Sequence, residues 1–346
     1  MTSRGKKGGM TVAIYDESSS RRKLYGILAS SLGMTVPSSV LTEALHTSRQ
    51  AVFKLVNALR DEGISIDSIP QKGYALNPTP QGDPLSPTAI THRLAEASLF
   101  HTFLYFPEVD STQKVLKKLA MQEAPQGIVT ASDIQTEGRG RRGRTWQNVS
   151  GKNLMFSMLL RPNLRPGEVQ LLNLAAGIAV RNVLVNNYSV NAELKWPNDI
   201  LAGGRKICGI LSEAAGETDK IYYAITGIGI NANMERKDLT DDIVDIATSV
   251  KMETGKSVVR AEMLLAVLAE FTSVAEILFS RDGTVKLLSL YREVCATIGK
   301  DIKVIQDNEE FCGRASGITE AGALIVEIDG KETVFAAADV HHLRLR

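Results

Sequence analysis

The residues best suited to chemistry form a glycine- and arginine-rich run, GRGRRGR, at 138–144, followed by Thr145 and Trp146. Glycine lets a backbone approach a ligand closely, and the guanidinium fork matches carboxylate and phosphate oxygens. The run is neither a Walker loop nor a GxGxxG motif at a helix start. It could be a disordered RNA-binding segment. Its short length and its place between two apolar strands favour a loop that orders over a small anionic ligand.

A second polar group, KWPND, occupies residues 195–199, and GGRKICGIL follows at 203–211. The residue before a proline is restricted to extended conformations, so Trp196 is predicted to be extended and Asn198 to begin a turn between strands. Lys206 heads the apolar strand that follows. A charged residue at a strand mouth can face a cleft, although an exposed lysine at a strand end is the commoner case.

Two shorter motifs allow both a structural and a functional interpretation. Residues 110–112, DST, form a good helix cap, which is the default interpretation. Residues 227–231, GIGIN, end a strand with two glycines. Such an ending is typical of a tight turn, or of a backbone that a ligand must approach closely.

The elements that must position these residues alternate along the central region. Helices are predicted at 112–123 and 171–185, with a further apolar helical stripe at 267–278. Strands are predicted at 103–106, 127–132, 153–160, 194–196, 206–214 and 221–230. This interleaving indicates an α+β domain with a mixed sheet. Residues 299–346 read as short strands with turns at 307–308, 320–322 and 329–330.

The N-terminal region has the order of a winged helix-turn-helix: helices at 22–32, 38–45 and 48–63, then a hairpin with a basic tip at 64–76. In that fold the third helix enters the DNA major groove through its N-terminal residues. Arginine and glutamine there can read base edges, and lysines can contact phosphates. The residues predicted to bind DNA are Ser48, Arg49, Gln50, Phe53, Lys54 and Lys72. A helical packing module with ordinary surface charges is the alternative.

Composition limits the remaining possibilities. The 346 residues suit two or three domains, with 44% hydrophobic and 23% charged residues. No apolar run predicts a membrane span, no secretion signal is evident, and the cytoplasm is the expected compartment. Three widely spaced cysteines and five histidines give no disulfide framework and no metal-ligand spacing. Residues 1–90 carry 10 Lys/Arg against 7 Asp/Glu, and the remainder carries 30 against 32, which permits a local nucleic-acid contact without proving one.

Five segments in order resemble the biotin protein ligase family, most specifically in the arginine loop with its tryptophan. They are residues 110–112, 135–146, 195–199, 205–211 and 227–231. With the winged helix in front and the strand-rich region behind, the resemblance covers residues 21–346. It is closest to the bifunctional bacterial class, in which the ligase is also the repressor of the biotin operon.

The resemblance implies a fold and a domain order. The fold class is α+β multidomain, with an N-terminal winged helix, a central mixed β-sheet with helices, and a small C-terminal SH3-like β-barrel. The expected division is a disordered lead at 1–20, the winged helix at 21–77, a linker at 78–88, the catalytic domain at 89–295 and the C-terminal domain at 296–346.

The same resemblance implies a two-step reaction. Biotin and MgATP give biotinyl-5′-AMP and pyrophosphate, and the biotinyl group then passes to a lysine of a biotin carboxyl carrier protein, as in acetyl-CoA carboxylase. No side-chain nucleophile is needed, and no tightly bound metal is expected. The implied partners are the carrier domain, operator DNA and a second copy of the chain when the adenylate is bound, with no membrane.

The resemblance also carries site residues onto this chain, with Lys206 and Arg139 as catalytic candidates. The implied biotin contacts are Ser111, Thr112, Gln113, Gln135, Arg139, Gly140, Arg141, Lys206 and Gly209. The implied ATP contacts are Arg141, Arg142, Arg144, Trp146, Asp199 and Asn231. The chain departs from the family pattern at Gln113, where asparagine is common, and at Cys208, where alanine is common.

Three alternatives remain at this point. A lipoate ligase of the same superfamily shares the adenylation chemistry. A transcription regulator could bind biotin without transferring it. A ligase could also carry a winged helix that regulates nothing.

Overall fold

The computed structural model describes residues 17–78, 83–94, 99–307, 309–336 and 338–342. The chain divides into two compact units, Met1–Glu96 and Ala97–Arg346. Most of the lead expected to be disordered, residues 1–20, lies outside the described residues. Its last four residues do not fit that expectation, because the first helix already begins at Glu17.

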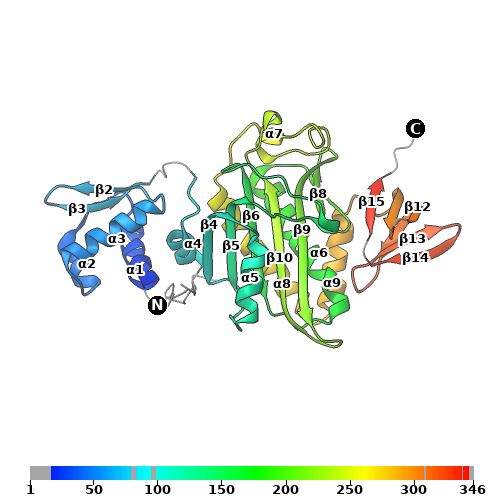
Figure 1. The fold of residues 1–346 in the computed structure, drawn as a ribbon, viewed down its shortest axis with the longest axis horizontal. Coiled ribbons are helices and arrows are strands. Elements are labelled where there is room, and N and C mark those ends of the chain that lie inside the picture. Colours follow the sequence, from blue (N-terminus) through cyan, green and yellow to red (C-terminus); the bar gives the residue numbers. More distant parts are fainter. Residues whose placement is uncertain (1–16, 79–82, 95–98, 308, 337, 343–346) are drawn as a thin grey trace, which may run out of the picture. The chain divides into compact units, whose positions relative to one another are not determined.

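The first unit contains a three-stranded sheet in the order β1-β3-β2, packed with helices (Figure 1). Its elements are α1 (Glu17–Ser30), β1 (Val36–Pro37), α2 (Ser38–Ala44), α3 (Arg49–Asp61), β2 (Ile66–Ile69), β3 (Gly73–Leu76) and α4 (Pro87–Leu94). The predicted helix-turn-helix and hairpin order is present. The short strand β1, which pairs with β3, had not been predicted from the sequence.

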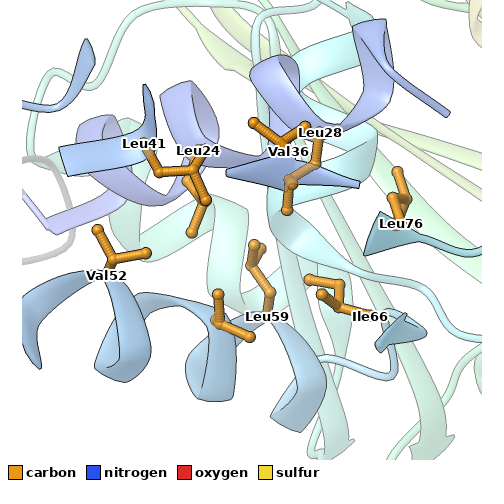
Figure 2. Packing of buried hydrophobic residues seen from close by; sticks show 9 residues of the cluster. Leu24, Leu28, Val36, Leu41, Val52, Leu59, Ile66 and Leu76 are labelled. Atoms are coloured by element: carbon orange, nitrogen blue, oxygen red, sulfur yellow. The ribbon is translucent and has the colours of Figure 1, made fainter. Parts of the chain in front are cut away.

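The core of this unit forms where α1, α2, α3 and the strands face one another (Figure 2). Val52, Val56 and Leu59 on α3 are buried, as the predicted apolar stripe requires, and Leu55 packs against them at the edge. Nine buried residues make up the cluster: Leu24, Leu28, Val36, Leu41, Val52, Val56, Leu59, Ile66 and Leu76.

The segment predicted to be a linker, residues 78–88, is packed against the winged helix at its C-terminal end. Glu62, just after α3, accepts hydrogen bonds from Ser86 Oγ (2.6 Å), Thr88 Oγ1 (2.7 Å) and Thr88 N (2.9 Å). This carboxylate therefore satisfies groups at the start of α4. The predicted boundary at residue 88 is wrong, because α4 packs on α1 and belongs to the first unit.

The second unit is built on a seven-stranded sheet in the order β4-β5-β6-β10-β9-β8-β7. The strands are β4 (Thr102–Val109), β5 (Ile128–Gln135), β6 (Asn153–Leu160), β7 (Ala192–Lys195), β8 (Asp199–Ala202), β9 (Arg205–Gly216) and β10 (Ile221–Asn231). Only β4 and β5 pair in parallel, joined by α5 (Thr112–Met121). Helix α5 covers one face, and α6 (Gln170–Tyr188), α8 (Arg260–Leu278) and α9 (Gly283–Val294) cover the other (Figure 1).

Helix α6 is the central core helix of this unit. Every residue from Leu171 to Val180 is buried. Among the described residues one helix, Pro166–Tyr188, is long and apolar enough to cross a membrane, with a mean hydropathy of 1.3 over its best window. Because 67% of that window is buried between the sheet and the other helices, core packing accounts for its apolar character.

The C-terminal part of the unit is a five-stranded antiparallel sheet in the order β14-β13-β12-β11-β15. Its strands are β11 (Asp301–Gln306), β12 (Glu309–Ile318), β13 (Leu324–Ile328), β14 (Lys331–Phe335) and β15 (Asp339–His342). The predicted turns at 320–322 and 329–330 lie between these strands, and Gly322 and Gly330 take positive φ values there. Asn308, in the third predicted turn, lies outside the described residues. The predicted α+β multidomain fold class is confirmed, and this strand-rich domain is consistent with the predicted SH3-like barrel.

The sequence pattern missed two helices and one strand of this unit. Helix α7 (Val250–Thr254), helix α9 and strand β8 had not been predicted. Strand β8 has four residues, too few for an alternating pattern to stand out. It begins at Asp199, so the turn predicted there is a three-residue connection, 196–198, between two paired strands.

Candidate active site

Three glycines leave one face of the sheet without side chains between β9 and β10. Gly227 and Gly229 alternate along β10, and Gly209 on β9 stands directly opposite Gly229. Because side chains alternate along a strand, all three positions face the same side. A Cβ atom at Gly229 would lie 2.6 Å from Trp146, and one at Gly209 would lie 2.8 Å from the same ring. Residues 227–231 lie within strand β10, so the tight-turn interpretation is wrong. Glycine is required at positions 209 and 229 because the Trp146 ring approaches the backbone closely there.

Buried hydroxyls line one end of this glycine strip. Ser157 on β6 stands opposite Gly227, and its Oγ lies 2.8 Å from Thr112 Oγ1. Gln135 Oε1 accepts from Thr112 N at 2.9 Å and from Thr112 Oγ1 at 3.2 Å. Such a group of fixed donors and acceptors can bind a polar ring.

The beginning of α5 differs from the predicted cap. Ser111 occupies the N-cap position, but its side chain makes no capping hydrogen bond. The backbone N–H of Thr112 is satisfied by Gln135 instead, and Asp110 Oδ1 accepts from Ser111 N at 2.8 Å. The Ser111 hydroxyl, buried at 6% exposure beside these groups, is therefore not used for capping the helix.

Gln113 points to the edge of the strip. Its Nε2 donates to the carbonyl of Leu211 at 2.8 Å, and a Cβ at Gly227 would lie 2.9 Å from Gln113 Cδ. The Gln113 amide thus covers Gly227 and is hydrogen-bonded to β9. Ser157, whose hydroxyl bonds to Thr112, lies on β6, the other neighbour of β10.

Lys206 lies at the other end of the strip. Its Nζ is 2.6 Å from Asp199 Oδ1 and 5.5 Å from the centroid of the Trp146 ring, a cation–π distance. The backbone of Lys206 is fixed by bonds to Ile246 O (2.7 Å) and from Thr248 N (2.9 Å). This lysine therefore faces the site and is not an ordinary exposed strand-end residue.

Trp146 covers the glycines between these two ends. Its indole N–H is buried and has no acceptor among the described residues. A buried donor without a partner costs free energy, so such groups are rare outside sites that take a ligand or water. The indole is positioned to stack against, or move aside for, a flat ring that enters over the strip.

The arginine loop faces the C-terminal sheet. Arg142 and Gly143 take positive φ values of 53° and 72° in a single 3₁₀ turn, Arg141–Gly143. Arg141 donates to Ala338 O at 3.0 Å, and Arg142 donates to Ile305 O at 2.8 Å. These specific contacts do not fit a disordered RNA-binding segment.

A carboxylate of the C-terminal domain is the charge partner of this loop. Asp339 forms ion pairs with Arg144 and, at 3.6 Å, with Arg142. Burial lowers the pKa of Arg141, and the Asp339 carboxylate opposes that shift. The Arg139 side chain instead lies 63% exposed and pairs with Glu137 at 3.6 Å. The four arginines of the loop therefore do not share one partner: Arg139 pairs with Glu137, and the other three contact the C-terminal sheet.

Asn231 has a different environment from the one implied for an ATP contact. Its Oδ1 accepts from Asn153 Nδ2 at 3.0 Å, and its Nδ2 donates to Thr248 O at 2.9 Å. The side chain is 6% exposed. It fixes the segment that also holds the Lys206 backbone, and both ends of its amide make hydrogen bonds within the protein.

Sequence reasoning missed two residues of the site. Ser157 is the single hydroxyl in the otherwise apolar strand β6 after Asn153, a signal that could have been found. Asp339 carries no such signal, because its pairing with Arg144 joins residues far apart in the sequence.

Clustered metal ligands and reactive thiols are two further kinds of site to consider among the described residues. Among the described residues no three His, Cys, Asp or Glu side chains gather as metal ligands. The three cysteines are free, and burial raises the pKa of the Cys208 thiol. A thiol held protonated in this way is a packing group rather than a nucleophile.

The predicted DNA-contacting residues lie together on the first unit. Ser48 caps α3 by accepting from Ala51 N at 3.2 Å, as predicted. The remaining predicted residues, Arg49, Gln50, Phe53, Lys54 and Lys72, are all exposed. Arg49, Phe53 and Lys72 line a groove between α3 and the β2–β3 hairpin.

Comparison with known proteins decides the family. Residues 105–231 match the biotin/lipoate A/B protein ligase family, and residues 297–343 match the biotin protein ligase C-terminal domain. The bifunctional ligase/repressor BirA of Bacillus subtilis (strain 168) is 33% identical over 298 residues, which cover 86% of this chain and 91% of the relative. The chain belongs to the biotin protein ligase family.

Further relatives agree with this assignment. The bifunctional ligase/repressor BirA of Escherichia coli (strain K12) is 32% identical over 290 residues, covering 84% of this ligase and 87% of the relative. The Aquifex aeolicus biotin protein ligase, solved with biotin and ATP, is 28% identical with a TM-score of 0.61, covering 70% of this ligase and all of that chain. The resemblance found in the sequence is confirmed. The curated relatives are biotin protein ligases, and several of them are bifunctional.

Proposed function

We propose that this biotin protein ligase forms biotinyl-5′-AMP from biotin and ATP and transfers the biotinyl group to a lysine of a biotin carboxyl carrier protein. The observation that supports this most strongly is the glycine strip, with buried hydroxyls at one end and Lys206 at the other. A bicyclic, largely apolar ring with a polar ureido group and a distant carboxylate suits such a site.

Each end of the strip then has its own role. Ser111, Thr112 and Gln135 hydrogen-bond the ureido group, and Gln113 closes the side near Gly227. Gly209 gives the ring room to lie against the sheet. Lys206 neutralises the carboxylate at the far end, beside Asp199.

Adenylation requires the site to hold two anions close together, the biotin carboxylate and the α-phosphate of ATP. A carboxylate oxygen of biotin attacks the α-phosphorus of ATP, and pyrophosphate leaves with the electron pair of the broken P–O bond. Lys206 stabilises the charge that develops on the phosphoryl oxygens. Proximity supplies much of the remaining acceleration, so no side-chain nucleophile is required.

The arginine loop and Trp146 serve the nucleotide in this proposal. Arg139, Gly140 and Arg141 clamp the biotin carboxylate and α-phosphate when the loop closes, and Trp146 lies beside the adenine. Arg142 and Arg144 leave their ion pairs with Asp339 and bind the phosphates of ATP instead. Asn231 acts by holding the neighbouring segment.

Magnesium fits this site as a companion of ATP. Mg²⁺ is usually held by one or two carboxylates together with substrate phosphates. Asp199, whose Oδ1 is 2.6 Å from Lys206 Nζ, is the carboxylate in position to do so. The ion would neutralise phosphate charge.

We also propose that the winged helix binds operator DNA of biotin genes and that the adenylate-bound chain dimerises to bind two half-sites. The exposed Arg49, Gln50 and Lys54 on α3 and the bifunctional relatives support this. The protein would carry out both functions in the cytoplasm. Fluorescence anisotropy at fixed salt, with and without biotinyl-5′-AMP, tests it, because phosphate contacts make affinity depend on salt. Binding that ignores the adenylate would leave a ligase with a non-regulatory winged helix.

The ligase proposal is tested by exchange of labelled pyrophosphate into ATP with biotin, with lipoate, or with neither acid. We expect exchange that depends on biotin. Exchange supported by lipoate alone would indicate a lipoate ligase, and no exchange with either acid would indicate a sensor that binds without activating.

A further inference from the structure

Lys195, at the end of β7, is a charged residue near the site to which neither the motifs nor the family resemblance gave a role. It is half-buried. Within the described part of the chain its ammonium forms no hydrogen bond or ion pair. The pairing of β7 in the sheet places this cation on the same face as the glycine strip.

Lys195 ends a cross-strand row that begins at the glycine strip. Gly229 on β10 pairs with Gly209 on β9, Gly209 pairs with Asp199 on β8, and Asp199 pairs with Lys195 on β7. Residues directly opposite one another in antiparallel strands have side chains on the same face. At a strand spacing of about 4.8 Å, Lys195 therefore stands about 10 Å beyond Gly209 on the face where the glycines lie.

The charges around Lys195 leave it without a carboxylate of its own. Burial lowers its pKa, and the opposing negative charges are Asp199 and Asp339, while Lys206 and Arg144 add positive charge. Asp199 is already paired with Lys206, and Asp339 with Arg144. A partly buried cation without a partner is costly, so an incoming anion would be bound strongly here.

The neighbouring histidines do not supply that anion. Burial lowers the pKa of both His341 and His342, and the nearby Lys195 ammonium lowers them further. His342 Nε2 lies 3.1 Å from Thr297 Oγ1. The permanent positive charge around Lys195 therefore comes from Lys195 itself, Lys206 and Arg144.

We propose that Lys195 binds the β- and γ-phosphates of ATP and stabilises pyrophosphate as it leaves. This rests on the proposed function, in which the biotin carboxylate and α-phosphate meet at Lys206. Asp199, the ion-pair partner of Lys206, stands in the row between Gly209 and Lys195, so Lys195 lies beyond Asp199, on the side toward which the remaining phosphates would extend. When the bond between the α-phosphorus and the bridging oxygen breaks, the electron pair goes to pyrophosphate, and the Lys195 ammonium faces that new charge without losing a proton.

The experiment separates the two half-reactions in purified full-length protein. Lys195→Met keeps the length and removes the charge, Lys195→Arg keeps the charge, and Lys118→Met on the exposed side of α5 is the matched control. One assay follows biotin-dependent exchange of labelled pyrophosphate into ATP. The other follows transfer from supplied biotinyl-5′-AMP to a carrier domain, in which no pyrophosphate takes part.

We expect Lys195→Met to lower kcat/KM for exchange by about 10- to 100-fold, the range for a lost hydrogen bond to a charged group, and to leave transfer within about twofold. Lys195→Arg should recover most of the exchange, and Lys118→Met should change neither assay. Equal losses in both assays, or none in either, would overturn the role of Lys195 while the ligase stands. Failure of the unaltered chain to exchange with biotin would overturn the ligase proposal and this inference together. Should Lys195→Met not fold, Lys195→Gln gives the same comparison.

Discussion

The two ends of the site are built in different ways. The end proposed to bind biotin is part of one sheet: the glycines of β9 and β10, Ser157 of β6 and the start of α5 are fixed by strand pairing and buried hydrogen bonds. The end proposed to bind the phosphates is assembled from the arginine loop, the β7–β8 hairpin and the C-terminal domain, and Asp339 neutralises its arginines. With these proposed roles, we expect binding of the ring to need little rearrangement, whereas binding of ATP must exchange one set of charge partners for another.

Lys206 lies where the two ends meet, so its loss should have the largest effect. We expect Lys206→Ala to lower the rate of biotin-dependent pyrophosphate exchange by about 100- to 1,000-fold, the range for removing a preorganised charge-stabilising group. Stopped-time assays at saturating biotin and MgATP measure it. Lys220→Ala, at the β9–β10 turn, is the control. A loss below tenfold would mean that the arginine loop carries the charge stabilisation.

The glycine strip should be sensitive to one added methyl group. A Cβ at Gly229 would lie 2.6 Å from Trp146 Cε2, so Gly229→Ala must displace the indole. We expect biotin binding to weaken by about 5- to 100-fold, the range for overpacking a close contact. Isothermal titration measures it, with Gly167→Ala, where an added Cβ meets no atom within 4 Å, as control. Unchanged affinity would show that biotin does not lie over this strip.

Removing the negative charge of Asp339 tests the proposed phosphate-binding end without altering the proposed biotin-binding end. Asp339→Asn keeps the shape but frees Arg142 and Arg144 from a competing carboxylate. We expect the KM for ATP to fall by about two- to fivefold, as suits a partly exposed ion pair, while the affinity for biotin stays constant. Steady-state exchange at varied ATP measures it. A higher KM would instead mean that Asp339 holds the loop in its ATP-binding shape.

Gln113 should give the smallest effect. Gln113→Asn removes the bond to Leu211 O and restores the residue common in the family. We expect the affinity for biotin to change by about threefold or less, because one neutral hydrogen bond at the edge of the strip is exchanged for water. Titration calorimetry measures it. A tenfold change would place the Gln113 amide on the ureido group itself.

Much of the fold could be predicted from the sequence because its main elements have clear periodicity. Strand β6 has the predicted bounds, residues 153–160, and the apolar stripe of α3 is buried. Helix α4 was missed because it is fixed by Glu62, a residue more than twenty positions away. Strand β8 was missed because four residues carry too little pattern.

The site could be predicted only where the residues lie in local motifs. Lys206 and Trp146, both named from local motifs, lie close together, with Lys206 Nζ 5.5 Å from the centroid of the Trp146 ring. The alignment of Gly229, Gly209, Asp199 and Lys195 depends on the register of four strands, and strand order and register are tertiary properties. The pairing of the arginine loop with Ala338 and Asp339 likewise depends on how a distant domain docks.

The most direct test of the central claim is labelling of a biotin carboxyl carrier domain, followed by intact mass measurement. We predict that the full-length chain with biotin and MgATP adds one biotinyl group to the carrier. Lys206→Ala should do so only when biotinyl-5′-AMP is supplied. An unlabelled carrier with the unaltered chain would contradict the assignment of this site to biotin transfer.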